Sequence, residues 1–165
     1  MRKTVSIAAG IAAAATIAFV AESCGSGTTA PTGKQYVANM IAANEQANIT
    51  TTGTGVFTFV DLGTEIDWTL TLTNMTAVIA SHIHLGDVNA VNTTAGPVII
   101  NLFLPNGPSG TLNGLVTHGI ITNANNANIS LDSLRVLFNN GHAYANVHTS
   151  AHPGGEIRDQ VHPVP

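Results

Sequence analysis

Hydrophobic and polar side chains alternate along most of the chain from about residue 35. In residues 66–73 a hydrophobic side chain takes every second position, and aspartate or threonine takes the positions between. The hydrophobic positions are Ile66, Trp68, Leu70 and Leu72. A period of two residues is typical of a half-buried antiparallel strand. Residues 53–61 have the same period, and the short connection through Gly63 predicts a β-hairpin.

Four later segments also have the composition of strands. They are AVIASHIHLG (77–86), GPVIINLFL (96–104), SGTLNGLVTHGI (109–120) and HAYANVHT (142–149), and clusters of glycine, proline and asparagine separate them. Short strands divided by regular turn signals predict an all-β fold, a single antiparallel β-sandwich.

One segment departs from the period of two. Leu131, Leu134 and Phe138 recur at helical spacing, with Ser130 available as the N-cap and Gly141 just past the end. The sequence therefore predicts one short helix near 131–139.

The first residues of the chain predict export. Arg2 and Lys3 precede an apolar run from Val5 to Val20, and small residues follow it. This order is typical of a secretory signal, and the run is too short to span a bilayer comfortably. We expect residues 1–23 to be removed as a signal peptide.

Cys24, the only cysteine, follows the predicted signal directly. A free thiol is unusual outside the cytosol, so lipid attachment to Cys24 would explain its presence. The alternative is plain secretion with an unpaired cysteine, because Glu22 fits a lipoprotein site poorly. We expect a protein that is lipid-anchored at the cell surface or periplasmic, and otherwise secreted. Residues 24–34 then form a flexible tether, and residues 35–165 form one domain.

Charge and composition exclude several classes of partner. The net charge is −4 at pH 7, and only 8% of the residues are charged. A weakly acidic chain without a basic stripe argues against binding to nucleic acid or to an anionic membrane surface. Contact with a membrane is therefore expected only through an anchor at Cys24. The hydrophobic content of 44% is enough for an ordinary core.

The candidate chemistry is carried by histidines. His82 and His84 are two apart and share one face of a strand, and His148 shares a face with Asn146. If the two strands are neighbours, three imidazoles form a site for copper or zinc, with binding expected to weaken below about pH 6.5. The alternative is that these histidines are hydrogen-bonded residues of the fold or exposed side chains.

The C-terminal stretch suggests a polar network. Asn146 and Thr149 could help to pin the last strand. After the turn at Pro153, Glu156 and Arg158 share a strand face and could pair with each other or with neighbouring strands. We expect these four polar residues to have structural roles.

Several of these motifs together carry a family resemblance. The segments SHIHLG, GPVIINLF, GTLNGLV and LDSLRVLFNNGHAYANVHTSAHPGGEIRDQV resemble, in order and spacing, the CHRD domain named after chordin. The resemblance covers about residues 35–162. Two features depart from the family pattern: Asp159 stands where glycine is usual, and QANIT follows Glu45 where prolines are common.

The resemblance implies an extracellular module. In animals such domains belong to an antagonist of a growth factor, and microbial members are exported proteins without an agreed activity. We therefore expect an exported, cell-surface or periplasmic binding module for an unknown extracellular ligand or protein. The alternative is a copper- or zinc-binding protein that uses His82, His84 and His148. Such a protein could also have redox activity like that of a superoxide dismutase. The sequence contains no nucleophile or nucleotide motif that would indicate an enzyme.

Overall fold

The computed structural model describes residues 33–87 and 96–165 of the 165-residue chain. Nine strands, one short 3₁₀ helix (η1) and one α-helix (α1) follow one another in this part of the chain. They are β1 (Lys34–Ile41), η1 (Ala42–Asn44), β2 (Thr54–Asp61), β3 (Ile66–Met75), β4 (Val78–Leu85), β5 (Val98–Phe103), β6 (Leu112–Ile121), α1 (Leu131–Asn140), β7 (Ala143–Thr149), β8 (Ile157–Gln160) and β9 (His162–Pro163).

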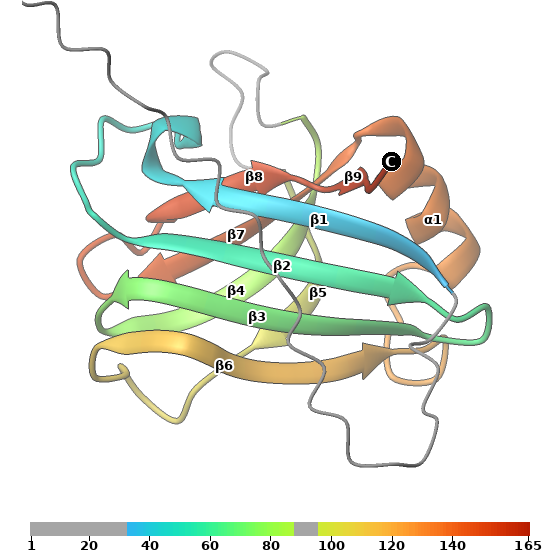
Figure 1. Ribbon diagram of the computed structural model, residues 1–165, viewed down its shortest axis with the longest axis horizontal. Helices are drawn as coiled ribbons and strands as arrows, with labels where there is room; N and C mark the ends of the chain where they lie inside the picture. The colour runs from blue at the N-terminus through green and yellow to red at the C-terminus, as the bar shows by residue number, and fades with distance from the viewer. Residues whose placement is uncertain (1–32, 88–95) are drawn as a thin grey trace, which may run out of the picture.

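The strands form one antiparallel sheet in the order β5-β4-β7-β8-β1-β2-β3-β6, with β9 paired to β1. The sheet curls so that β1, β2, β3 and β6 lie in front of β4, β5, β7 and β8 (Figure 1). The predicted antiparallel all-β fold with one short helix is confirmed. The predicted sandwich is not clearly formed, because a single path of hydrogen-bonded neighbours joins the two layers into a nearly closed barrel.

The predicted β2–β3 hairpin supplies much of the core. Phe57 and Phe59 are fully buried, and Trp68 is only 7% exposed. The Trp68 ring meets Phe57 edge-on, with 5.8 Å between the ring centroids. Gly119 on β6 lies against the indole, since a Cβ there would be 2.8 Å from its ring. The alternation along the sequence therefore assigned the buried faces correctly.

Helix α1 begins and ends where the sequence predicted. The Ser130 side chain accepts a hydrogen bond from the Ser133 amide, and Gly141 ends the helix in the left-handed conformation at φ 64°. The buried face consists of Leu131, Leu134 and Phe138. Within the described ranges, no helix has the length and apolarity needed to cross a bilayer.

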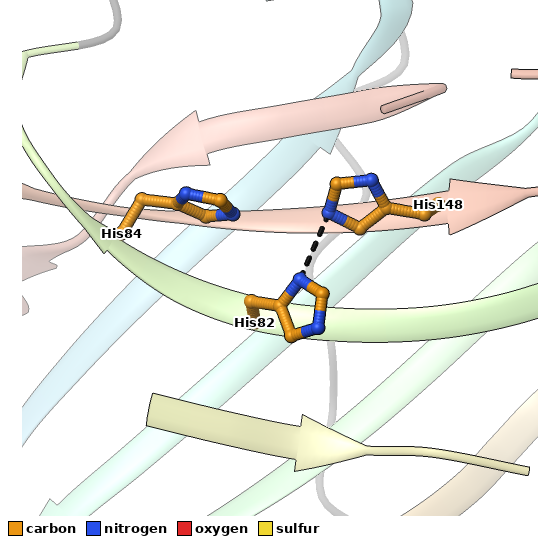
Figure 2. A group of neighbouring side chains, drawn as sticks. All are labelled: His82, His84 and His148. Carbon is orange, nitrogen blue, oxygen red and sulfur yellow. Dashed lines mark hydrogen bonds between the residues drawn. The ribbon is translucent and has the colours of Figure 1, made fainter. Parts of the chain in front are cut away.

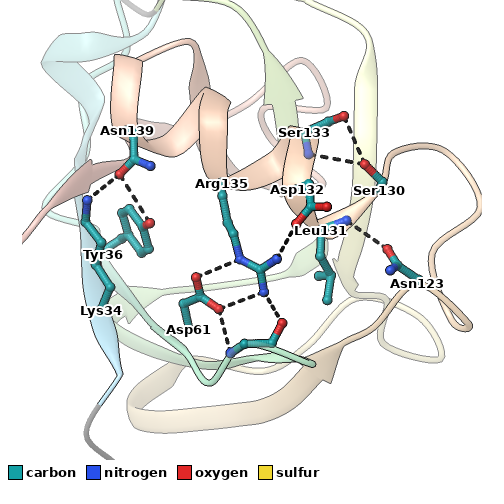
Figure 3. A network of polar contacts seen from close by, with 11 residues as sticks. Lys34, Tyr36, Asp61, Asn123, Ser130, Leu131, Asp132, Ser133, Arg135 and Asn139 are labelled. Atoms are coloured by element: carbon teal, nitrogen blue, oxygen red, sulfur yellow. Dashed lines mark hydrogen bonds and ion pairs between the residues drawn. The ribbon is translucent and has the colours of Figure 1, made fainter.

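An arginine fixes α1 against the end of β2 (Figure 3). The Arg135 guanidinium donates to both carboxylate oxygens of Asp61 at 2.7 and 2.9 Å, and to Asp132 at 2.7 Å. The hydrogen bonds from Arg135 lower the pKa of Asp61. Asp61 is therefore a structural partner of the helix.

Candidate metal centre

Strands β4 and β7 are neighbours, as the three-histidine hypothesis requires. His82 lies opposite Asn146 in the antiparallel register, and His148 lies opposite Ala80. Directly opposed residues point to the same face of a sheet, so the side chains of His82, His84 and His148 share one face. The residues between them, such as Ile83 and Val147, are fully buried in the core.

The three imidazoles converge (Figure 2). One nitrogen of each ring can be chosen so that all three lie within 4.8 Å of one another. The Nδ1 of His82 is 3.0 Å from the Nε2 of His148. Two nitrogens bound to the same tetrahedral zinc are about 3.3 Å apart, from metal–nitrogen bonds of about 2.0–2.1 Å. The group is therefore close to the spacing that a single ion requires.

Burial favours the uncharged form of these histidines. His84 is 4% exposed and His148 is 8% exposed, and His82 is partly buried. Desolvation lowers the pKa of all three, and for His82 the neighbouring His148 and His84 add to the effect and bring the pKa to about 4. Neutral imidazole is the form that binds metal. The lowered pKa values move the expected pH limit of metal binding below that of ordinary histidine.

Backbone carbonyls orient two of the rings. The Nδ1 of His84 lies 2.7 Å from the Gly96 carbonyl oxygen, and the Nδ1 of His148 lies 3.0 Å from that of Pro153. Each Nδ1 must carry the proton to donate it, so each Nε2 presents a lone pair. The Nε2 of His84 is buried and has no hydrogen-bond partner in the described part of the chain. It is available to an ion.

Tyr144 supports the site, although the sequence analysis assigned it no role. Its ring stacks on His84 with 4.9 Å between centroids and an interplanar angle of 6°. Its hydroxyl accepts a hydrogen bond of 3.0 Å from the Gly96 amide, and Gly96 in turn holds His84. The Arg158 guanidinium carbon lies 5.3 Å from the centroid of the same ring. The only signal in the sequence was that Tyr144 shares a strand face with Asn146 and His148.

The predicted polar network is buried beside the histidines. Glu156 accepts hydrogen bonds from the hydroxyls of Thr149 at 2.6 Å and Thr51 at 2.8 Å. Arg158 donates to the Asn44 carbonyl and lies 3.7 Å from a Glu45 carboxylate oxygen. Glu156 and Arg158 thus contact other segments of the chain, and Thr149 is one of the hydrogen-bond partners of Glu156.

Asn146 lies in the same region, opposite His82 on the paired strand. No hydrogen bond joins its side chain to the three histidines in the described chain, and its Oδ1 is buried without a donor. The hydrogen bonds that orient His84 and His148 come from backbone carbonyls. Cys24, the predicted lipid attachment site, lies outside the described residues.

Comparison with known proteins supports the resemblance seen in the sequence. The family model described as CHRD domain matches residues 32–161, which is most of the chain. No curated protein and no solved structure gives a match.

Proposed function

Since this chain belongs to the CHRD-domain family, we propose that it binds copper or zinc through His82, His84 and His148. The observation that supports this proposal is the convergence of three imidazoles, with ligand atoms within 4.8 Å, on paired strands. Two of the rings already have the second-nitrogen hydrogen bonds that orient metal ligands in proteins.

The donor set favours particular metals. Among the residues that the structure describes, the cluster contains imidazole nitrogens and no carboxylate or thiolate. Imidazole suits copper and zinc, and the usual affinity order places Cu(II) above Zn(II). Three protein ligands leave a fourth position for water or a small ligand. A closed structural site would need a fourth side chain, so the proposed site is an open one.

The test is calorimetric titration of Cu(II) and Zn(II) into protein without a histidine tag. We expect one ion per chain for the wild type, with Cu(II) bound more tightly. His82→Ala and His148→Ala should each weaken binding by about 100-fold or more, since even outer-shell changes cost 10–100-fold. His118→Ala is the matched control, because His118 is exposed on β6 and should bind like the wild type. Equal weak uptake by all four proteins would disprove the site.

A redox role is a second candidate that depends on copper. Copper held by His82, His84 and His148 would supply a one-electron centre that takes an electron from one superoxide, releasing O₂, and passes it with two protons to a second superoxide, giving H₂O₂. The His-x-His strand resembles that of copper–zinc superoxide dismutase only in this motif. The copper-loaded protein should then accelerate superoxide loss, whereas the zinc-loaded and His82→Ala proteins should not. Equal rates for copper- and zinc-loaded protein would exclude this role.

Export and anchoring form the other part of the proposal. The basic residues, apolar run and Cys24 at the N-terminus support a secreted or lipid-anchored protein. In that setting the domain is a cell-surface or periplasmic binding module, and the metal is its first proposed ligand.

A further inference from the structure

His82 differs from the other two histidines of the cluster in its second ring nitrogen. The Nδ1 atoms of His84 and His148 each meet a backbone carbonyl. The Nδ1 of His82 instead meets the ring of His148, and its Nε2 has no hydrogen-bond partner in the described part of the chain. A metal ion bound at Nδ1 leaves the proton of the neutral ring on Nε2, and this N–H then needs an acceptor to orient the ring.

The acceptor must lie on the β5 side of His82. Strand β4 lies between β5 and β7 in the sheet, and the Nδ1 of His82 points to His148 on β7. The two nitrogens of an imidazole point in nearly opposite directions, so Nε2 of His82 points away from the other two rings (Figure 2). Asn146 lies on β7, and its amide lies against Gly155. It is therefore on the wrong side of His82 to accept from Nε2.

Strand β5 places Asn101 directly opposite His82. Opposed residues of an antiparallel pair share a face, with Cβ atoms about 4.5–5.5 Å apart. The neighbouring pair is Ser81 with Phe103, so an unbroken register would put Leu102 opposite His82. A register shift at this point leaves Leu102 out of the pairing and brings an amide to that position. Bulges of this kind re-aim side chains and are frequent beside functional sites.

We propose that Asn101 is a positioning residue of the metal centre, whose Oδ1 accepts the Nε2–H of His82 when a metal ion is bound at Nδ1. This inference rests on the proposed metal site. The Asn101 side chain is exposed and has no hydrogen bond to another residue in the described ranges, so its amide can turn to His82. All three histidines would then have an acceptor on the nitrogen that does not bind the metal.

The test compares Zn(II) binding by the wild type, Asn101→Leu and Asn101→Asp, all without a histidine tag. Leucine has a similar size and no acceptor, and we expect about tenfold weaker binding. This is the lower end of the range for outer-shell changes, because His82 is only partly buried and water can replace the amide. Aspartate keeps an acceptor, so Asn101→Asp should bind at least as tightly as the wild type. Asn39→Leu, at an exposed asparagine of β1, is the matched control and should bind like the wild type.

Heteronuclear NMR of the zinc-loaded imidazoles separates positioning from a merely structural role. In the wild type and Asn101→Asp, the proton on Nε2 of His82 should exchange slowly with solvent, and in Asn101→Leu it should exchange faster. A residue that only stabilises the strand would leave this exchange unchanged.

Two results would overturn the role of Asn101 while leaving the metal site intact. The first is wild-type affinity and wild-type Nε2–H exchange in Asn101→Leu. The second is binding by folded Asn101→Asp that is as weak as that of Asn101→Leu. A wild type that binds no more zinc than His82→Ala would overturn the metal site itself, and the role of Asn101 with it.

Discussion

The protonation of His82 is set by its neighbours. The Nδ1 of His148 donates to the Pro153 carbonyl, so the Nε2 of His148 accepts, and the Nδ1 of His82 donates to it. A metal ion that binds His82 through Nδ1 requires the proton to move to Nε2 of the same ring. The neutral imidazole can make this change without losing a proton to solvent.

In the metal-free protein, the contribution of His82 to the free energy of unfolding should fall as the pH drops from about 6.5 to about 4. Unfolded His82 takes up a proton near pH 6.5, whereas in the folded protein its pKa is about 4. Between these values the unfolded state binds more protons, so acid favours unfolding. The expected loss for His82 is on the order of 1–3 kcal/mol, allowing for its partial exposure. Urea denaturation over this pH range measures it.

A pair of variants isolates this effect. The raised pKa of Glu45 acts in the opposite direction between about pH 4.5 and 7, because there the folded state binds more protons. The difference between wild type and His82→Asn removes the common contribution of Glu45. His82→Asn should flatten the acid limb, and exposed His118→Asn should not. An acid limb that is unchanged in His82→Asn would contradict the assigned pKa.

Tyr144→Phe should weaken metal binding while leaving the ring stacked on His84. The substitution removes only the hydroxyl that holds Gly96, whose carbonyl orients His84. We expect about tenfold weaker Zn(II) and Cu(II) binding, typical of outer-shell changes. Tyr36→Phe is the control, since it removes another buried tyrosine hydroxyl, the one bound to Asn139. Equal affinities for the two variants would show that the Tyr144 hydroxyl has no part in positioning His84.

At the scale of elements, the pairing of β4 with β7 creates the three-histidine cluster. His82 and His84 alternate with Ile83, and a register shift of one residue would turn both imidazoles into the core. The fully buried Ile83 and Val147 oppose this shift, because it would expose them. Burial of the hydrophobic side chains therefore sets the strand register, and this register brings the histidines on the other face together.

Trp68→Ala should destabilise the protein by about 3–5 kcal/mol, the usual cost of removing a large buried side chain. The indole packs between Phe57 and Gly119 on neighbouring strands, and alanine would leave a cavity there. Thr69→Ala on the opposite face is the comparison, since its hydrogen bond to Thr58 is exposed and its loss should cost far less. Chemical denaturation of both variants gives the free energies. An unchanged melting temperature for Trp68→Ala would contradict the packing.

For the whole molecule, the main prediction concerns its attachment. We predict that the mature protein begins at Cys24 and carries acyl chains. At least two chains are needed for stable anchoring, because one gives only marginal, reversible binding. The intact mass of protein extracted from membranes measures both the new terminus and the lipid. Cys24→Ala should release the protein from the membrane fraction. A mature terminus downstream of Cys24 would contradict the prediction.

The sequence by itself determined the strand faces, the single helix and the family. The period of two placed Trp68 inside, and it placed His82 and His84 together, because side-chain direction along a strand depends only on local geometry. Ser130 and Gly141 marked the ends of α1 for a similarly local reason.

Only the tertiary structure decided which strands pair and what surrounds the site. His82 and His148 are 66 positions apart, and no local pattern says that their strands are neighbours. The same holds for the Gly96 and Pro153 carbonyls and the Tyr144 ring, which come from separate parts of the chain. It holds as well for the nearly closed sheet where a sandwich was predicted. Strand pairing depends on how all the strands together bury their hydrophobic surface. The alternation within one segment carries no information about the other segments.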